Sequence, residues 1–206
     1  MTSRAAVAMS ASALVAVAAH GTTRLPSVRD GDIIFHTSRS SQSEAVQRAT
    51  ASRYSHMGLV LYRAGAPYVL EAAATVRYTP LDQWIARGQG RHFVLKRLKA
   101  AATVLDSKTL GALREGARRL QGRPYDLTFE WSDERLYCSE LVWKLYDRAA
   151  GVRIGELQKL REFQLSDPLV KAKLQQRYGS AIPLEEAVVS PSAMFASPLL
   201  ETIAEE

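Results

Sequence analysis

The stretch RLYCSELVWKLYDRAAG, Arg135–Gly151, holds the clearest helical pattern in the chain and also its only cysteine. Apolar residues recur at helical spacing after the cysteine, which predicts an amphipathic helix over Cys138–Gly151 with one face packed on a core. The expected apolar face consists of Leu141, Val142, Leu145, Tyr146 and Ala149. Cys138 is therefore predicted to begin a helix that is buried along one side.

Cys138 at this position has two interpretations. The first turn of a helix presents free N–H groups and a partial positive charge, which stabilise a thiolate and can hold the oxyanion of an acyl-transfer intermediate. A buried cysteine can instead serve as a small hydrophobic residue. A single cysteine cannot form an intramolecular disulfide. In an exported protein, Cys138 is therefore expected to be either buried and inert or retained for its chemistry.

The 206 residues suit a single domain, and it is predicted to be α+β because the expected strands cluster on one side and the expected helices on the other. Two of the strands are expected to form a hairpin through a five-residue turn, Arg63–Pro67. A helix is expected to follow Thr79 as its N-cap, with Pro80 at its first position. The expected strands are 33–35, 57–62, 68–74 and 91–98, and the other expected helices are 41–50, 106–122 and 167–179.

Two polar residues in the predicted hairpin are candidates to work with Cys138. His56 lies where a short loop enters the strand 57–62, and Glu71 interrupts the otherwise apolar strand 68–74. A charge in such a strand is costly unless it is paired, and a Cys–His pair needs a third group to orient the imidazole. The hairpin brings His56 near Glu71, with the register depending on the turn. Alternatively, Glu71 faces solvent, which strand alternation also permits.

Other candidates are weaker. Tyr54 and Tyr137 flank the histidine and the cysteine, and are expected either to line the cleft and donate a hydrogen bond or to pack in the core. His36 and His92 are expected at the surface or at a strand edge. The four histidines and one cysteine lack zinc-like spacing, so we expect no metal and no other cofactor.

The first residues differ from the rest of the chain. One early arginine precedes an Ala/Val-rich run without charge, and small residues follow at Val17–Ala19. This pattern predicts a secretory signal peptide over residues 1–19, a linker over 20–28 and the domain over 29–206. The protein is then expected to be exported to the periplasm or cell envelope. An uncleaved anchor, or an Ala-rich leader on a cytoplasmic protein, is the alternative.

The net charge of +6 is scattered along the chain. A basic balance favours contact with anionic envelope material such as membrane surfaces or cell-wall polymers. Aromatic residues are not interleaved with the basic ones in the way that single-stranded nucleic-acid sites require. We therefore expect peripheral contact with the envelope and no nucleic-acid partner.

Several of these segments together resemble one family, the YiiX/YaeF-type permuted papain-like amidases of the NlpC/P60 cysteine hydrolase superfamily. The resemblance spans about residues 31–197 and is most specific at YCSELVWK. It implies a circularly permuted papain-like fold, in which an antiparallel sheet or partial barrel packs on the cysteine helix and the histidine strand precedes that helix. The matching segments are GDIIF (31–35), YSHMGLVLY (54–62), YVLEA (68–72), YDLTFEWSDERLYCSELVWKLY (125–146) and VVSPSAMFAS (188–197).

The resemblance also implies roles. The family's nucleophile falls on Cys138, its histidine on His56 and its acidic orienting residue on Glu71, for hydrolysis of an amide bond without a metal. A peptide-, peptidoglycan- or lipid-like envelope substrate is expected. Two alternatives remain: a lipid acyltransferase or hydrolase with the same triad, and an envelope-binding module without turnover. An apolar cleft would favour the lipid alternative, whereas a polar cleft with an acidic pocket would favour a peptide.

Overall fold

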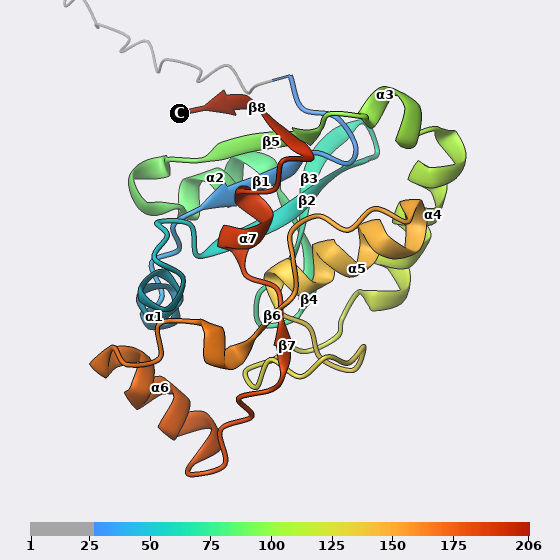
Figure 1. The fold of residues 1–206 in the computed structure, drawn as a ribbon. Coiled ribbons are helices and arrows are strands. Elements are labelled where there is room, and N and C mark those ends of the chain that lie inside the picture. Colours follow the sequence, from blue (N-terminus) through green and yellow to red (C-terminus); the bar gives the residue numbers. More distant parts are fainter. Residues whose placement is uncertain (1–26) are drawn as a thin grey trace, which may run out of the picture.

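A computed structural model gives the architecture of the protein and describes residues 27–206 (Figure 1). The predicted signal peptide and nearly all of the predicted linker lie outside the described residues. Six antiparallel strands form one sheet in the order β4-β3-β2-β1-β5-β8. These strands are β1 (Ile33–His36), β2 (His56–Arg63), β3 (Ala66–Ala72), β4 (Val76–Pro80), β5 (Val94–Leu98) and β8 (Leu200–Glu205). A second, two-stranded sheet pairs β6 (Gln158–Lys159) with β7 (Ala187–Val188).

Helices cover both faces of the main sheet (Figure 1). They are α1 (Ser41–Thr50), α2 (Leu81–Arg87), α3 (Ala101–Val104), α4 (Ser107–Leu120), α5 (Cys138–Ala150), α6 (Pro168–Tyr178) and α7 (Pro191–Phe195), with 3₁₀ turns η1 (Gln89–Arg91) and η2 (Leu160–Glu162). No helix within residues 27–206 is long and apolar enough to cross a membrane.

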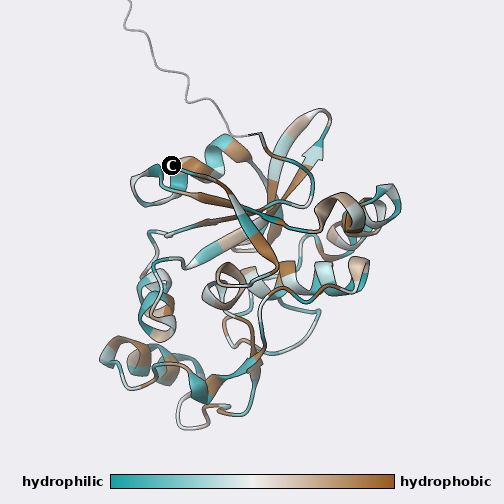
Figure 2. Ribbon diagram, turned by 45° about the horizontal axis from the view of Figure 1, so that its top comes forward, coloured by the Kyte–Doolittle hydropathy of each residue, from teal (hydrophilic) through white to brown (hydrophobic). Residues whose placement is uncertain are grey.

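The sheet is buried on both sides because strand residues alternate between two hydrophobic clusters. Ile33 and Leu59 face the larger cluster, which includes the inner faces of α4 and α5. Ile34 and Val60 face the smaller cluster under α2. Figure 2 shows hydrophobic residues gathered in the strands and on the inner turns of the helices. The central strands therefore have no solvated face, and a polar side chain within them must find partners inside the protein.

The β2–β3 hairpin turns more tightly than expected. Arg63 pairs with Ala66, which leaves Ala64 and Gly65 as a two-residue turn with φ angles of 48° and 81°. Both angles lie in the left-handed region that this kind of hairpin turn requires, and glycine adopts it without a steric penalty. The expected five-residue turn is therefore wrong, and the strands run almost to the tip.

Strand β4 is not in the sequence prediction. The Thr79-Pro80 pair has the pattern of a helix start, but Thr79 lies in β4 opposite Val69, and α2 begins only at Leu81. Pairing with β3 provides ladder hydrogen bonds that outweigh the weak local preference of a short polar segment. The expected N-cap role of Thr79 is therefore wrong, and its side chain is available for a partner inside the sheet.

Helix α5 begins at Cys138 and ends before Gly151, as the sequence predicts. Gly151 has a φ of 66°, the left-handed conformation that commonly ends a helix. The burial is more extensive than a one-sided pattern predicts, since Glu140 and Lys144 are buried as well. They form an ion pair of 2.7 Å, so the helix keeps these charges inside the protein by pairing them.

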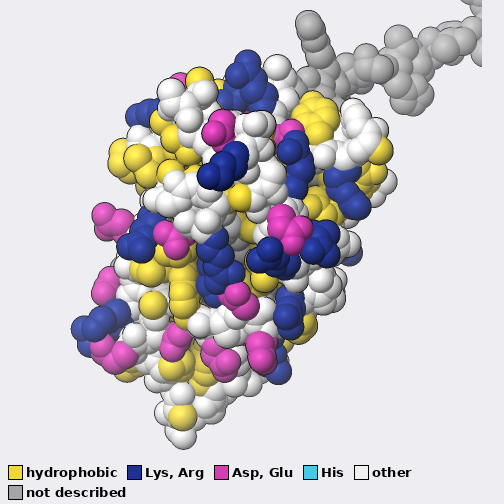
Figure 3. All heavy atoms as spheres, turned by 90° about the vertical axis from the view of Figure 1, so that its right-hand side faces the viewer, with side chains coloured by type: hydrophobic (Ala, Val, Ile, Leu, Met, Phe, Trp, Pro, Cys, Tyr) yellow, Lys and Arg dark blue, Asp and Glu magenta, His cyan; other side chains and the backbone are white. Residues whose placement is uncertain are grey.

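The face that carries α3, α4 and α5 shows basic and acidic side chains side by side (Figure 3). Glu115 pairs with Arg118 and Arg119 at 2.8 and 2.9 Å, and Asp133 pairs with Arg148 at 2.7 Å. Such exposed pairs contribute about 0–1 kcal/mol each. The net positive charge of the chain is therefore not gathered on this face.

Candidate active site

Cys138 occupies the first position of α5 and is almost fully buried. Tyr137 precedes it in an extended conformation, so the chain enters the helix at the cysteine. The hydroxyl of Ser139 donates to the carbonyl of Val189 at 2.8 Å, and the N–H of Val189 donates to the hydroxyl of Tyr137 at 3.1 Å. These two bonds fix the start of α5 against the segment that follows β7, and they hold the thiol at the helix N-terminus.

His56 is the first residue of β2, and its imidazole contacts Glu71 and is influenced by Cys138. Its Nε2 atom lies 2.7 Å from a carboxylate oxygen of Glu71. This contact leaves Nδ1 as the ring nitrogen for the thiol. Burial lowers the pKa of His56, but hydrogen bonds to Cys138 and Glu71 outweigh it and raise the pKa to about 9. The site therefore favours an imidazolium next to the sulfur.

Glu71 is fully buried and receives hydrogen bonds from several donors besides His56. Thr79 Oγ1 lies 2.6 Å, Trp84 Nε1 3.0 Å and Arg87 Nη2 2.5 Å from its carboxylate oxygens. Burial alone would raise the pKa of Glu71, but the hydrogen bonds from His56 and Thr79 and the charge of Arg87 hold it well below its usual range. The alternative in which Glu71 faces solvent is wrong, and the carboxylate is ionised at neutral pH.

His36 lies in the interior beside these groups, whereas we expected it at the surface or at a strand edge. Its ring stacks on Trp84 with the centroids 3.8 Å apart, and lies 5.4 Å from the ring of His56. It is buried because β1 is an inner strand of the sheet, paired on both edges, and α2 covers that face. Burial and the charge of His56 lower the pKa of His36 to about 2, so His36 stays neutral.

The structure separates the two tyrosines that the sequence singles out. Tyr54 stacks on Phe195 at 4.2 Å in the core and lines neither of the cavities near Cys138. Tyr137 lines one of them, with its hydroxyl engaged by Val189. The cleft-lining interpretation therefore does not suit Tyr54, whose position is that of a core residue.

Tyr125 is a site residue that the sequence prediction missed. It lines both cavities, and its hydroxyl accepts a hydrogen bond of 3.0 Å from Gln42 Nε2. Burial and the nearby charge of Cys138 raise the pKa of Tyr125 above its usual range, which keeps the phenol protonated. Its segment lacks helical or strand periodicity, so its closeness to Cys138 arises only from tertiary structure. Its place in the family-like segment 125–146 was the available signal.

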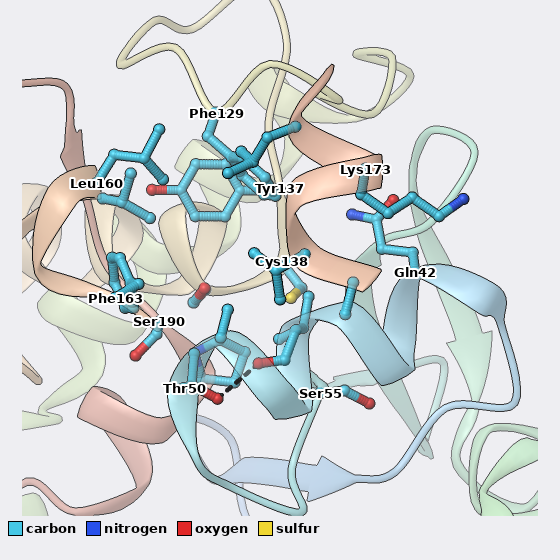
Figure 4. Close-up of a pocket in the computed structure, with 18 of the residues that line it drawn as sticks. Gln42, Thr50, Ser55, Phe129, Tyr137, Cys138, Leu160, Phe163, Lys173 and Ser190 are labelled. Atoms are coloured by element: carbon cyan, nitrogen blue, oxygen red, sulfur yellow. Dashed lines mark hydrogen bonds between the residues drawn. The ribbon is translucent and has the colours of Figure 1, made fainter. Parts of the chain in front are cut away.

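The first cavity, which we call the apolar cavity, opens beside Cys138 and measures about 720 Å³ including its mouth (Figure 4). Figure 4 shows Cys138 among the lining residues, with Tyr137, Leu160 and Phe163 on one side and Gln42 on the other. No aspartate or glutamate lines it. Its apolar wall comes from α1, α6 and the segments around η2 and β7, and includes Ala45, Val46, Ala49, Phe129, Leu160, Phe163, Leu165, Val170, Leu174 and Val188.

The second cavity, which we call the polar cavity, measures about 1010 Å³ including its mouth. His56 lines the polar cavity and not the apolar one, whereas Cys138 lines only the apolar cavity. Gln42, Ser55 and Tyr125 line both, so they form the boundary between the two spaces. Its remaining lining residues are His36, Ser38, Arg39, Ser40, Ser43, Ala72, Ala73 and Arg87.

Comparison with known proteins agrees with this architecture. The protein YiiX of Escherichia coli K12 is 53% identical over 176 residues, which are 85% of this chain and 86% of that protein. A crystal structure of yiiX from Escherichia coli O157:H7, described as a metalloprotein, superimposes with a TM-score of 0.82 at 54% identity, over 86% of this chain and 97% of that one. The expected α+β fold, with the histidine strand before the cysteine helix, is confirmed. Residues 27–204 match the family model described as permuted papain-like amidase, YaeF/YiiX, C92, and the chain belongs to this family.

Proposed function

We propose that the protein is a thiol-dependent hydrolase that cleaves an amide bond in cell-envelope material through Cys138, His56 and Glu71. The observation that supports it most directly is the position of one imidazole. His56 is bound to a buried, ionised carboxylate through Nε2, and the nearby Cys138 at a helix N-terminus contributes to its raised pKa. This arrangement offers a nucleophile, a base and an orienting group within one site.

In the proposed mechanism, His56 takes the thiol proton and Cys138 attacks the carbonyl carbon. The backbone N–H of Cys138 and the phenol of Tyr125 hold the oxyanion, since the raised pKa of Tyr125 keeps its proton in place. His56 then gives the proton to the leaving amine as the C–N bond breaks and a thioester forms. Water attacks the thioester with His56 as the base, which releases the acid and restores the thiol.

Glu71 has a positioning role in this proposal. Its donors Thr79, Trp84 and Arg87 come from β4 and α2, and its contact with His56 comes from β2, so three structural elements fix the direction of one carboxylate. The carboxylate in turn fixes the imidazole and stabilises its charged form.

The apolar cavity bears on the substrate. Its wall is mostly hydrophobic, with Lys173 and Arg177 as its charged residues and no carboxylate, so it suits an apolar acyl chain on Cys138 better than a cationic stem peptide. We therefore favour a lipid-like amide substrate within the hydrolase proposal. A lipid acyltransferase with the same thioester intermediate is the second candidate, in which an amine or alcohol replaces water in the last step.

A metal centre at the triad does not fit the residues present. The relative of known structure is described as a metalloprotein. Within residues 27–206, no group of three or more His, Cys, Asp or Glu side chains is placed to hold a metal ion. The carboxylate oxygens of Glu71 already accept hydrogen bonds from Thr79, Trp84 and Arg87. No step of the proposed mechanism uses a metal.

Mass spectrometry of the intact protein tests the proposal. Brief mixing with an N-acyl amide should add the mass of one acyl group to the native protein, as the acyl-enzyme forms. The Cys138→Ala variant should show no addition. Free fatty acid should accumulate with native protein and stop with Cys138→Ala or His56→Ala. Muropeptides tested in parallel should be poor substrates. Folded native protein that neither acylates nor releases acid from either class would make the binding-module alternative the better one.

The envelope location is also a proposal, based on the predicted leader over residues 1–19. Cell fractionation compares the full chain with a chain that lacks these residues. The full chain should be recovered in the envelope fraction and the shortened chain in the cytoplasm. Equal cytoplasmic recovery of both forms would contradict export.

A further inference from the structure

The polar cavity is placed to receive the leaving group of the reaction. In amide hydrolysis the acyl part stays on the cysteine, whereas the amine departs next to the histidine that protonates it. Cys138 lines only the apolar cavity and His56 only the polar cavity, so the two halves of the substrate have separate sites. Gln42 and Tyr125 line both, which places the scissile bond at their boundary. This step rests on the proposed function.

The polar cavity is positively charged. Two arginines, Arg39 and Arg87, line it together with several hydroxyl groups, and no aspartate or glutamate does. Arg87 is partly neutralised by Glu71, 2.5 Å away. Arg39 donates to the backbone carbonyl of Gly88 at 3.2 Å and forms no ion pair with a carboxylate of residues 27–206. The charge of Arg39 is therefore not neutralised by the protein.

Neighbouring elements add to the positive electrostatic potential of the polar cavity. Helix α1 begins at the cavity, where its N-cap Ser40 is a lining residue and accepts from the N–H of Ser43 at 3.1 Å. A helix N-terminus adds partial positive charge to that of Arg39. The carboxylate of Glu71 has no exposed surface and lies behind His56, so it does not present negative charge to the cavity. All the formal charge that faces the space is positive.

We propose that the polar cavity binds an anionic group on the leaving amine, so that the substrate is an N-acyl amine bearing a carboxylate or a phosphate close to the amide. Arg39 is the residue that selects this anion. Water and the acyl amide then give a fatty acid and an amine that bears the anion. The proton that His56 took from Cys138 ends on the amine nitrogen, and the proton that the fatty acid releases on ionising at neutral pH makes this amine an ammonium.

Two matched pairs of soluble substrates test the proposal and distinguish the two anions. N-octanoylglycine is compared with N-octanoylglycinamide, and N-octanoyl-phosphoethanolamine with N-octanoylethanolamine. We expect kcat/KM to favour an anionic member by about tenfold or more, the contribution of one charge-assisted hydrogen bond. The pair with the larger preference identifies the anion. Equal kcat/KM within both pairs, or a preference for the neutral members, would overturn the proposal.

Arg39→Gln should remove most of this preference. Arg91→Gln is the matched control, because Arg91 is an exposed arginine that lines neither cavity and its loss changes the net charge equally. Equal preference ratios in the two variants would also refute the role of Arg39. Arg39 is exposed, so its replacement should leave the thermal midpoint unchanged.

A binding measurement separates this proposal from the hydrolase proposal. Calorimetry with the Cys138→Ala variant compares N-octanoylglycine with its amide, and N-octanoyl-phosphoethanolamine with its alcohol, without turnover. Tighter binding of an anion, weakened by Arg39→Gln, supports the anion site even if no substrate is cleaved. Equal binding within both pairs overturns it whatever the activity.

Discussion

Replacing Glu71 by glutamine should uncouple the proposed Cys–His pair. The pKa of His56 rises from 6.5 to about 9 in the folded protein, which corresponds to about 3 kcal/mol in favour of the imidazolium. Cys138 and Glu71 both contribute to that rise. Assigning Glu71 roughly half gives about 1–2 kcal/mol, or roughly a tenfold smaller population of the imidazolium–thiolate pair.

The assay is the rate of iodoacetamide alkylation as a function of pH, followed by intact mass. The chain has one cysteine, so every added carbamidomethyl group reports on Cys138. Only the thiolate reacts, and in the proposed pair an imidazolium at His56 stabilises it. In Glu71→Gln, alkylation at about pH 6 should therefore be roughly tenfold slower than in the native protein. His56→Ala should give the profile of an ordinary thiol.

Glu115→Gln is the control, since Glu115 is a carboxylate on α4 that pairs only with Arg118 and Arg119 among the described residues. It should leave the profile unchanged. Glu71→Gln keeps the shape of the side chain but leaves Arg87 facing a neutral partner, so circular dichroism must first show that the variant is folded. Superimposable profiles for native protein, folded Glu71→Gln and His56→Ala would refute the coupling of the three groups.

Four further outcomes follow from the same geometry. Tyr125→Phe should lower kcat by about 10²-fold with little change in KM if its phenol holds the oxyanion, and an unchanged kcat would exclude it. Ala49→Trp should fill the apolar cavity and lower kcat/KM for octanoyl amides at least about tenfold relative to acetyl amides; an equal loss for both would contradict acyl binding there. Leu141→Ala should lower the free energy of unfolding by about 2–5 kcal/mol, measured by urea denaturation, because Leu141 is fully buried; a loss below this range would mean that the site repacks. Because the pKa of His56 is raised, its contribution to stability is complete below about pH 6.5 and is lost as the pH rises through about 9. The free energy of unfolding of the native protein should therefore fall by about 1–3 kcal/mol over this interval, and that of His56→Ala by much less. Parallel curves of unfolding free energy against pH would refute this coupling.

Local patterns predicted the elements that hold the catalytic candidates. Helix α5 follows from apolar spacing and from Gly151, and the β2–β3 hairpin follows from two apolar runs around Gly65. Both signals are local, because they depend on side-chain periodicity and on the left-handed conformation of a few glycines. The cost of a charge within an apolar strand was enough to single out Glu71.

Other features depend on contacts between distant segments and could not be read locally. Thr79 and Pro80 have the composition of a helix start, but pairing with β3 places them in a strand. Trp84 and Arg87 are unremarkable in a short amphipathic helix, yet both donate to Glu71 across the sheet. His36 looks like a strand-edge residue, but the ring of Trp84 stacks on it from α2 and it is buried. In each case the decisive partner lies many residues away.

The missed strand β4 has the largest consequence for the proposed chemistry. Without β4, Glu71 would lie on the edge strand, with Thr79 elsewhere and its carboxylate accessible to water. With β4 in place, Thr79 donates directly to Glu71, and α2 follows at once to bring Trp84 and Arg87 over the same carboxylate. A carboxylate held by so many donors stays ionised although it is buried, and an ionised carboxylate is what sustains an imidazolium at His56. The edge of the sheet is therefore part of the proposed catalytic apparatus, because it fixes the charge state on which the Cys138 thiolate depends.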